Sequence, residues 1–176
     1  MTLVFCDTSS LILLEKAGMF PDVAAHLDLC ISPSVLDEIT ATDTSDACMF
    51  AGLAEKGGIR VAGLPEHPID PGSSPGLDRL DTGEKDTIGL YLDQQQGFIL
   101  VDDGPAAKWC LSNSLPFINA LLVPKIFWYA GIMSRSACMN KMNRLCRLGW
   151  YSQKVRTIAF EYRRKDLAFF VDRVKR

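Results

Sequence analysis

The sequence predicts a three-layer α/β fold, with a short parallel sheet at its centre and helices on both faces. Five short apolar runs recur along the first 120 residues, and each is long enough for one strand. Segments whose apolar residues follow helical spacing separate these runs. Short strands that alternate with helices are typical of a parallel sheet, because each return to the next strand needs a crossover.

Helix starts and stops divide the first 62 residues into three strands and four helices. Ser32-Pro33 indicates a helix start, because proline suits the first helical position, and Gly57-Gly58 ends a helix. The expected strands are Leu3–Phe5, Leu29–Ile31 and Ile59–Ala62. The expected helices are Leu11–Ala17, Phe20–His26, Pro33–Ile39 and Ser45–Lys56.

The next part begins with a long loop, Gly63–Asp81, which carries four prolines. A helix with Thr82 as its candidate cap runs to Gln96, and the strand Phe98–Val101 follows. After a helix to Asn113, a last strand is expected at Pro116–Asn119. Beyond residue 120 the chain is mostly helical, and its end is expected to form one helix over Gln153–Arg176 or, alternatively, a strand over Arg156–Tyr162.

Composition excludes several classes of protein. With 176 residues, 48% of them hydrophobic, and a net charge of −2, the chain can build one domain with a proper core and is neither disordered nor collagen-like. Two histidines are too few for a His-rich metal site. Charge is divided unequally, because residues 1–105 hold 5 Lys+Arg and 18 Asp+Glu, whereas residues 106–176 hold 14 and 3.

We expect a cytoplasmic protein that does not enter a membrane. No secretory signal is visible. The six cysteines form no CxxC pair and lie among apolar neighbours, which is typical of reduced, buried thiols. The apolar stretch Leu115–Met133 contains two prolines and Lys125, so we expect a strand and a buried helix there rather than a membrane span.

Carboxylates are expected to gather at one edge of the sheet. Asp7 and Asp102 directly follow strands, and the carboxyl ends of parallel strands face the ligand crevice. Glu38, Glu84 and Asp86 lie near the starts of helices that we place at the same edge. Carboxylates this close raise one another's pKa values unless a cation neutralises them. Because oxygen ligands without His or Cys suit hard ions, the pattern predicts a Mg²⁺ or Mn²⁺ site.

Four motifs resemble those of PIN-domain nucleases, a family that includes the ribonuclease toxins of bacterial and archaeal toxin–antitoxin pairs. In the family's order they are Asp7-Thr8-Ser9-Ser10, Ile31 to Glu38, Gly83 to Ile88 and Leu100 to Gly104. Leu145–Ser152 is also similar to the helical tail of one PIN subgroup. We therefore expect a PIN-like domain over residues 1–120 and a basic helical extension over residues 121–176, packed on the same domain.

The resemblance implies an enzyme that hydrolyses RNA phosphodiester bonds, a metal-dependent endoribonuclease in which a metal-bound water attacks the phosphorus. It implies that the catalytic residues are Asp7, Glu38, Glu84 and Asp102, and that these four and Asp86 hold one or two Mg²⁺ or Mn²⁺ ions. Thr8 would orient Asp7 or a water through its hydroxyl. Relatives differ in whether the acid stands at the position of Glu84 or of Asp86, so both stay candidates.

The basic C-terminal part predicts an RNA-binding surface, because Lys and Arg attract phosphate backbones. The basic residues concerned are Lys141, Arg144, Arg147, Arg163 and Arg164, and the candidates for stacking on bases are Trp150, Tyr151 and Tyr162. The same residues also fit a solvated basic face with core aromatics, or a surface for an acidic antitoxin segment. The resemblance further implies a homodimer.

The alternative interpretation is a non-catalytic RNA- or partner-binding module on the same fold. The intact set of acids favours the nuclease, because a binding module gains nothing from unpaired carboxylates. A phosphatase of the HAD type would need a second Asp where Ser9 stands. A Rossmann module would need a glycine-rich turn after the first strand, and the sequence has none there.

Overall fold

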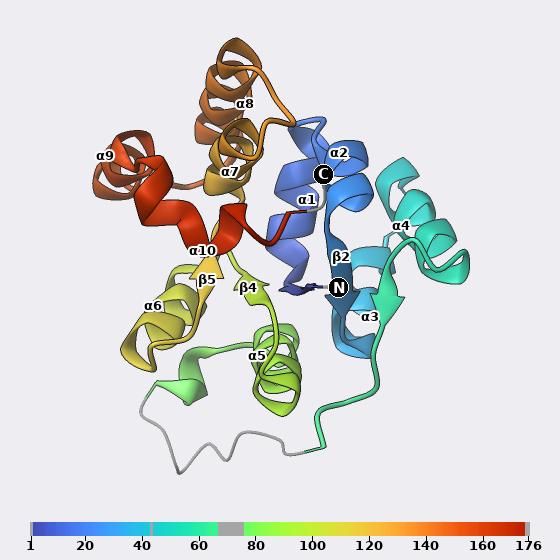
Figure 1. Ribbon diagram of the computed structural model, residues 1–176. Coiled ribbons are helices and arrows are strands. Elements are labelled where there is room, and N and C mark those ends of the chain that lie inside the picture. The colour runs from blue at the N-terminus through green and yellow to red at the C-terminus, as the bar shows by residue number, and fades with distance from the viewer. Residues whose placement is uncertain (1, 43, 67–75, 175–176) are drawn as a thin grey trace.

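A five-stranded parallel sheet with helices on both faces forms the centre of the protein, as the computed structural model shows for residues 2–42, 44–66 and 76–174 (Figure 1). The strands are β1 (Leu3–Cys6), β2 (Asp28–Ile31), β3 (Arg60–Val61), β4 (Phe98–Leu100) and β5 (Phe117–Ile118). They lie in the order β3-β2-β1-β4-β5. The predicted three-layer α/β fold and its five strands are confirmed.

The helices and short 3-10 segments (η) connect the strands and continue beyond them. In chain order they are α1 (Thr8–Lys16), α2 (Phe20–His26), α3 (Pro33–Thr40), α4 (Ser45–Glu55), η1 (Leu77–Arg79), α5 (Thr82–Gln94), α6 (Gly104–Ser112), η2 (Ala120–Leu122), α7 (Val123–Tyr129), α8 (Arg135–Leu148), α9 (Gln153–Glu161), η3 (Arg164–Leu167) and α10 (Ala168–Val171).

The two central strands are buried on both faces, and their side chains alternate between the larger core on one face and two smaller clusters on the other. Val4 of β1 and Leu100 of β4 belong to the larger core, which also contains buried residues of α1, α7 and α8. Ile99, one residue away from Leu100, belongs to the core beneath α5 and α6. This alternation follows from the two-residue period of a strand.

Glycine makes the central pairing of β1 with β4 possible. Gly97 directly precedes β4 and has φ +85°, in the left-handed region. A Cβ at this position would overlap the carbonyl oxygen of Leu3. Because only glycine tolerates both conditions, Gly97 lets β4 reach its register, in which Cys6 stands opposite Leu100.

The end of the chain differs from the prediction of one helix over residues 153–176, and the alternative strand is wrong as well. The buried ammonium of Lys125 donates to the carbonyl oxygens of Ala159 (2.9 Å) and Phe160 (2.6 Å), so the last turn of α9 needs no further helical donors. The backbone N–H of Arg163 then donates to the carboxylate of Asp166 (2.8 Å), which starts η3. Residues 175–176 of the expected helix lie outside the described residues.

Two further predictions can be compared with the structure: the loop over Gly63–Asp81 and the absence of a membrane span in Leu115–Met133. Within Gly63–Asp81 the described residues include η1, and residues 67–75 lie outside the described part. The stretch Leu115–Met133 contains β5, η2 and α7, in which Lys125 is buried. Among the described residues, no helix combines the length and apolar character needed to cross a membrane. All six cysteines are free, and four are buried as expected, whereas Cys48 is exposed and Cys146 is half-buried.

The helices after β5 pack against the sheet-bearing part of the chain. Helix α8 contacts α1 and η2, and α10 contacts α7 (Figure 1). Their buried residues, such as Met142 and Leu145, belong to the same core as Val4. A boundary at residue 120 stays a prediction.

Candidate active site

An acidic cleft lies at the carboxyl edge of the sheet and measures about 100 Å³. The starts of α1, α5 and α6 and the C-terminal half of α3 contribute its lining: Asp7, Thr8, Ser9, Glu38, Asp81, Gly83, Glu84 and Asp103. Five of these residues are acidic, and none of these described lining residues is basic. Sequence-distant segments thus bring carboxylates together, as expected for strand ends and helix starts at one edge of a parallel sheet.

Asp7 is fixed by both the strand before it and the helix after it. Its backbone N–H donates to the carbonyl oxygen of Leu100 (3.2 Å) and so continues the β1–β4 pairing. As the N-cap of α1, its Oδ1 accepts from the backbone N–H of Ser10 (2.9 Å), and its Oδ2 accepts from the hydroxyl of Ser9 (2.6 Å). The carboxylate is buried, with 3% of the residue exposed.

Glu38 reaches the same cleft from α3. The hydroxyl of Thr8 donates to Oε2 of Glu38 at 2.8 Å. The prediction gave Thr8 a role in orienting Asp7 or a water, whereas the structure pairs it with Glu38. The approach of α3 to α5 needs a small residue at Gly83, because a Cβ there would lie 3.2 Å from Glu38 Oε2 and 3.3 Å from Val35 Cγ2.

Glu84 enters the cleft as part of a capping box. Asp81, rather than the expected Thr82, is the N-cap of α5, and its Oδ1 accepts from the backbone N–H of Glu84 (2.8 Å). In return, Glu84 Oε2 accepts from the backbone N–H of Asp81 (3.0 Å). The hydroxyl of Thr87 donates to the carbonyl oxygen of Cys6 (3.3 Å), which fixes the start of α5 against the end of β1.

Asp86 lies outside the cleft, unlike Glu84. Its Oδ2 accepts from the hydroxyl of Ser34 (2.6 Å) at the start of α3, and Ser34 in turn shares a hydrogen bond with Ser32 (2.7 Å). Two residues apart on a helix, Glu84 and Asp86 point in nearly opposite directions. The structure therefore does not bring Asp86 together with the other predicted metal ligands.

Asp102 is near enough to Asp7 for its charge to act on that carboxylate, but it is not among the residues that line the cleft. Its Oδ2 accepts from the backbone N–H of Ala120 (2.9 Å), and its Oδ1 accepts from the hydroxyl of Tyr151. Tyr151, predicted as a residue that stacks on bases, is partly buried and instead holds Asp102. No sequence signal could have paired these two residues, because 49 positions separate them.

Two further acids were missed as site residues. Asp81 and Asp103 both line the cleft, and both stand at the N-cap of a helix that starts at this edge. Asp103 makes no side-chain capping hydrogen bond, so its carboxylate is not committed to α6. Their position in the sequence could have identified them, because each acid directly precedes a helix that begins at the carboxyl edge of the sheet.

The pKa values of the acids indicate uncompensated negative charge. Burial raises the pKa of Asp7 to about 6, and the charge of Asp102 contributes to this rise. Burial likewise raises the pKa of Glu84 to about 8, with Asp81 and Asp103 as neighbouring negative charges. Burial also raises the pKa of Asp102, against the opposing hydrogen bond from Tyr151. An added cation would relieve all three shifts.

The chemistry of this donor set fits a hard divalent cation. In the part of the chain that the structure describes, no group of three or more His, Cys, Asp or Glu side chains is already arranged to hold a metal ion. Mg²⁺ keeps several waters and uses only one or two carboxylates directly, so a cleft lined by carboxylates and hydroxyls suits it. Asp7 and Glu84 are the buried acids of the lining, and Glu38 and Asp103 are exposed at its rim.

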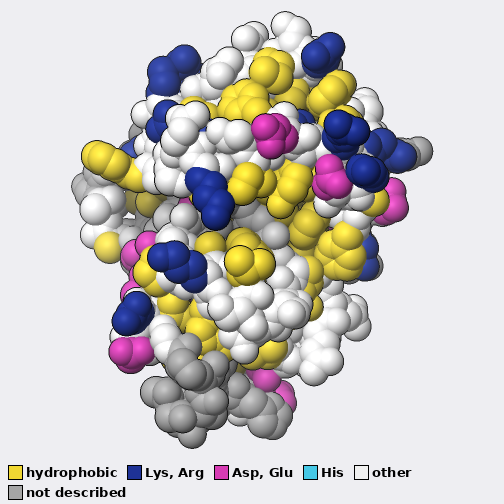
Figure 2. Space-filling model, turned by 90° about the vertical axis from the view of Figure 1, so that its left-hand side faces the viewer, with side chains coloured by type: hydrophobic (Ala, Val, Ile, Leu, Met, Phe, Trp, Pro, Cys, Tyr) yellow, Lys and Arg dark blue, Asp and Glu magenta, His cyan; other side chains and the backbone are white. Residues whose placement is uncertain are grey.

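The predicted RNA-binding cations lie on two separate elements. Lys141, Arg144 and Arg147 belong to α8, whereas Arg163 and Arg164 are exposed at the junction of α9 and η3. The Lys141 ammonium donates to the carbonyl oxygens of Ala17 (3.1 Å) and Gly18 (2.8 Å), so it caps the end of α1. On the face that carries α6 and α9, hydrophobic side chains lie between the Lys and Arg residues (Figure 2).

Comparison with known families gives one match. The model of a family described as PIN domain matches residues 3–157, which include all five strands, the acidic cleft and the segment that carries Tyr151. No curated protein matches the chain.

Proposed function

Because the chain belongs to the PIN-domain family, whose members are generally nucleases, we propose that it is a metal-dependent endoribonuclease that hydrolyses RNA phosphodiester bonds. The observation that supports this proposal most strongly is the acidic cleft. Four separate segments contribute carboxylates to it, and the buried acids Asp7 and Glu84 have raised pKa values. Such a site is costly without a cation, and perturbed carboxylates in a cleft are typical of catalytic sites.

We propose that Asp7 and Glu84 hold a Mg²⁺ or Mn²⁺ ion, with Glu38 and Asp103 at the rim and the charge of Asp102 close to Asp7. A divalent ion in a nuclease neutralises phosphate charge and lowers the pKa of water. The protein's own contribution is orientation. Ser9 and the N–H of Ser10 hold both oxygens of Asp7, and Thr8 holds one oxygen of Glu38, so the acids need little rearrangement to receive a cation.

Cation binding should compete with protons in this cleft. With pKa values of about 6 and about 8, Asp7 and Glu84 retain protons at pH values where ordinary carboxylates are ionised. Because ligands must be deprotonated, the affinity for Mn²⁺ should rise between about pH 6 and about pH 8. Calorimetric titration with Mn²⁺ at a series of pH values measures this, and an affinity independent of pH in that window would contradict the assignment.

The decisive experiment is cleavage of a mixed RNA pool in the presence of Mn²⁺. We expect Asp7→Asn and Glu84→Gln, which remove proposed ligands, to lower the rate by more than about 100-fold. Asp102→Asn, which changes a neighbour of the ligand Asp7, should lower it by about 10-fold to 100-fold. Asp37→Asn, an equivalent change at an exposed carboxylate of α3, should cleave like the wild type. Equal cleavage by Asp7→Asn and the wild type would remove the proposed site. Tight RNA binding without cleavage by any of the proteins would favour the binding-module alternative.

We also propose that the nuclease acts in the cytoplasm as the toxin of a toxin–antitoxin pair, as a homodimer that an antitoxin binds. The support for this proposal is the motif resemblance to ribonuclease toxins. Induced expression should arrest growth for the wild type and not for Asp7→Asn at equal protein levels. Growth that continues with an active wild-type nuclease would point to an RNA-processing role instead.

A further inference from the structure

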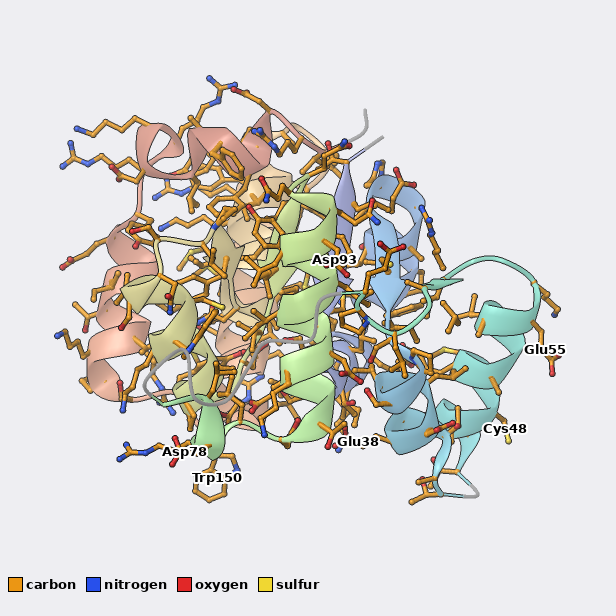
Figure 3. All side chains as sticks on the ribbon, turned by 90° about the horizontal axis from the view of Figure 1, so that it is seen from below. Glu38, Cys48, Glu55, Asp78, Asp93 and Trp150 are labelled. Atoms are coloured by element: carbon orange, nitrogen blue, oxygen red, sulfur yellow. The ribbon has the colours of Figure 1, made fainter. Side chains whose placement is uncertain are left out.

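Trp150 is fully exposed, at 104% of its reference area, although tryptophan is among the largest apolar side chains. The exposed fractions of other large hydrophobic residues are smaller, at 70% for Leu111 and 66% for Leu64. The indole projects from the surface of the protein, as Figure 3 shows. A side chain of this size in water has no packing role in the described structure of the chain.

The backbone on both sides of Trp150 is held in place. The N–H of Gly149 donates to the carbonyl oxygen of Leu145 (2.8 Å) at the end of α8. Gly149 also leaves room for the ring of Tyr151, because a Cβ at residue 149 would lie 2.5 Å from Tyr151 Cε2. After Trp150, the Arg156 side chain donates to the carbonyl oxygen of Tyr151 (3.0 Å). The indole therefore stands on a fixed support.

A hydrogen bond and a neighbouring charge link this support to the acidic cleft. Tyr151 donates its hydroxyl to Asp102, whose charge acts on Asp7 in the cleft. Trp150 is the preceding residue, and consecutive Cα atoms are about 3.8 Å apart. Figure 3 shows Trp150 and Glu38 in the lower part of the view, whereas Asp93, near the C-terminal end of α5, lies higher.

The basic residues of α8 lie along the helix on the side of the chain that precedes Trp150. The Lys141 ammonium lies at the C-terminal end of α1, while the residues that follow α8 lie near Asp102, beside the N-terminal end of α1. Helix α8 thus runs toward the cleft. Arg144 and Arg147 lie on it between these two points, both exposed, and they line a hollow of about 370 Å³ with Asn140, Lys141 and Asn143.

We propose that Trp150 is a stacking platform for an unpaired base of the RNA that the cleft binds. This inference rests on the proposed nuclease function. Stacking of a base on an aromatic side chain needs an exposed ring face and is independent of sequence. Because the backbone that carries the indole is already held, binding has to order only the two side-chain torsions of Trp150. Bases within a duplex are stacked on one another and are not free to use the indole.

The test measures RNA binding apart from cleavage. Asp7→Asn protein is titrated in Mg²⁺ into a fluorescently labelled single-stranded RNA of about 12 nucleotides, within the site sizes of single-strand binders, and into the matching duplex. Anisotropy is the readout, and a gel shows that the RNA stays intact. Trp150→Ala and Trp150→Phe are compared in this background. Leu111→Ala is the matched control, because it removes another highly exposed apolar side chain.

We expect Trp150→Ala to weaken binding of the single strand by about 5-fold to 100-fold, which corresponds to the measured range for one base–aromatic contact. Trp150→Phe should retain part of the affinity, and the duplex and Leu111→Ala should show no such loss. Equal affinity of Trp150→Ala and its parent, or an equal loss with the duplex, would overturn the proposal. A smaller sedimenting mass for Trp150→Ala would overturn it too, and would assign the indole to a protein interface. Failure of the nuclease assay with this binding pattern intact would refute the catalytic proposal alone.

Discussion

Replacing Asp7 with asparagine should stabilise the metal-free protein while it removes nuclease activity. The substitution keeps the shape of the side chain, and the new amide oxygen can still accept the N–H of Ser10, because asparagine is a good N-cap. The hydroxyl of Ser9 can rotate to accept from the new amide. What the change removes is a buried negative charge beside Asp102.

The size of the effect follows from the pKa of Asp7. In the folded protein the pKa is about 6, against an ordinary value of 3.8. A raised folded-state pKa means that the folded protein binds the proton more tightly than the unfolded chain does. Its stabilising contribution is therefore complete below about pH 4 and is lost as the pH rises through about 6. The difference in pKa corresponds to about 3 kcal/mol, at about 1.4 kcal/mol per unit.

Above pH 7 the Asp7→Asn protein should therefore be more stable than the wild type. The substitution also removes the favourable interaction of the carboxylate with the start of α1, which reduces the gain in stability by up to about 1 kcal/mol. The free energy of unfolding should therefore rise by about 2–3 kcal/mol in total. For a chain of this length the melting temperature should rise by about 4–12 °C at pH 8. At pH 4 the difference should disappear, because Asp7 is then protonated in the folded wild type.

Thermal unfolding in EDTA, followed by circular dichroism at pH 4, 6 and 8, measures the difference. Asp37→Asn is the control, since a change at an exposed carboxylate should stay within about 0.5 kcal/mol at every pH. Addition of Mn²⁺ should stabilise the wild type more than Asp7→Asn, because only binding to the folded protein raises its stability. Lower stability of Asp7→Asn at pH 8, or a difference that does not change with pH, would refute the reasoning.

Three further changes test the surroundings of the site and the fold. Tyr151→Phe should weaken Mn²⁺ binding by about 10-fold to 100-fold, since it removes a donor that positions Asp102; unchanged affinity would argue against that role. Lys125→Met should lower the free energy of unfolding by about 2–4 kcal/mol, because it leaves two carbonyls at the end of α9 without their donor; urea unfolding measures this. Gly97→Ala should prevent stable folding, because its Cβ would overlap the Leu3 carbonyl; a soluble variant with a native circular dichroism spectrum would contradict the register of β4.

The elements that local patterns determine could be predicted from the sequence. Ser32 caps α3 and Pro33 occupies its first turn, as the sequence indicates. The apolar run at Phe98–Val101 forms the buried strand β4. These features depend on residues that are neighbours in the chain, so composition and spacing contain them. The same holds for the placement of Asp7, which directly follows a strand and caps a helix.

The choice between Glu84 and Asp86 could not be made from the sequence, for a geometric reason. Two positions apart on a helix correspond to a rotation of about 200°, so only one of the two acids can face the cleft. The helix is rotated by its contacts with the rest of the fold, including the hydrogen bond from Thr87 to the end of β1 and the bond from Ser34 to Asp86. These contacts join distant parts of the chain, and no local pattern encodes them.

The C-terminal helices take part in the candidate site as well as packing against the sheet. Tyr151, far beyond the last strand, donates to the acid that follows β4, and Ala120 at the start of η2 donates to the other oxygen of that acid. A change in the packing of α8 would therefore move a hydrogen bond of Asp102 as well as a surface helix. The match to the PIN-domain family extends to residue 157 and so includes Tyr151. Proteins truncated after β5 should on this basis lose the orientation of Asp102 together with the cations of α8, even if the sheet still formed.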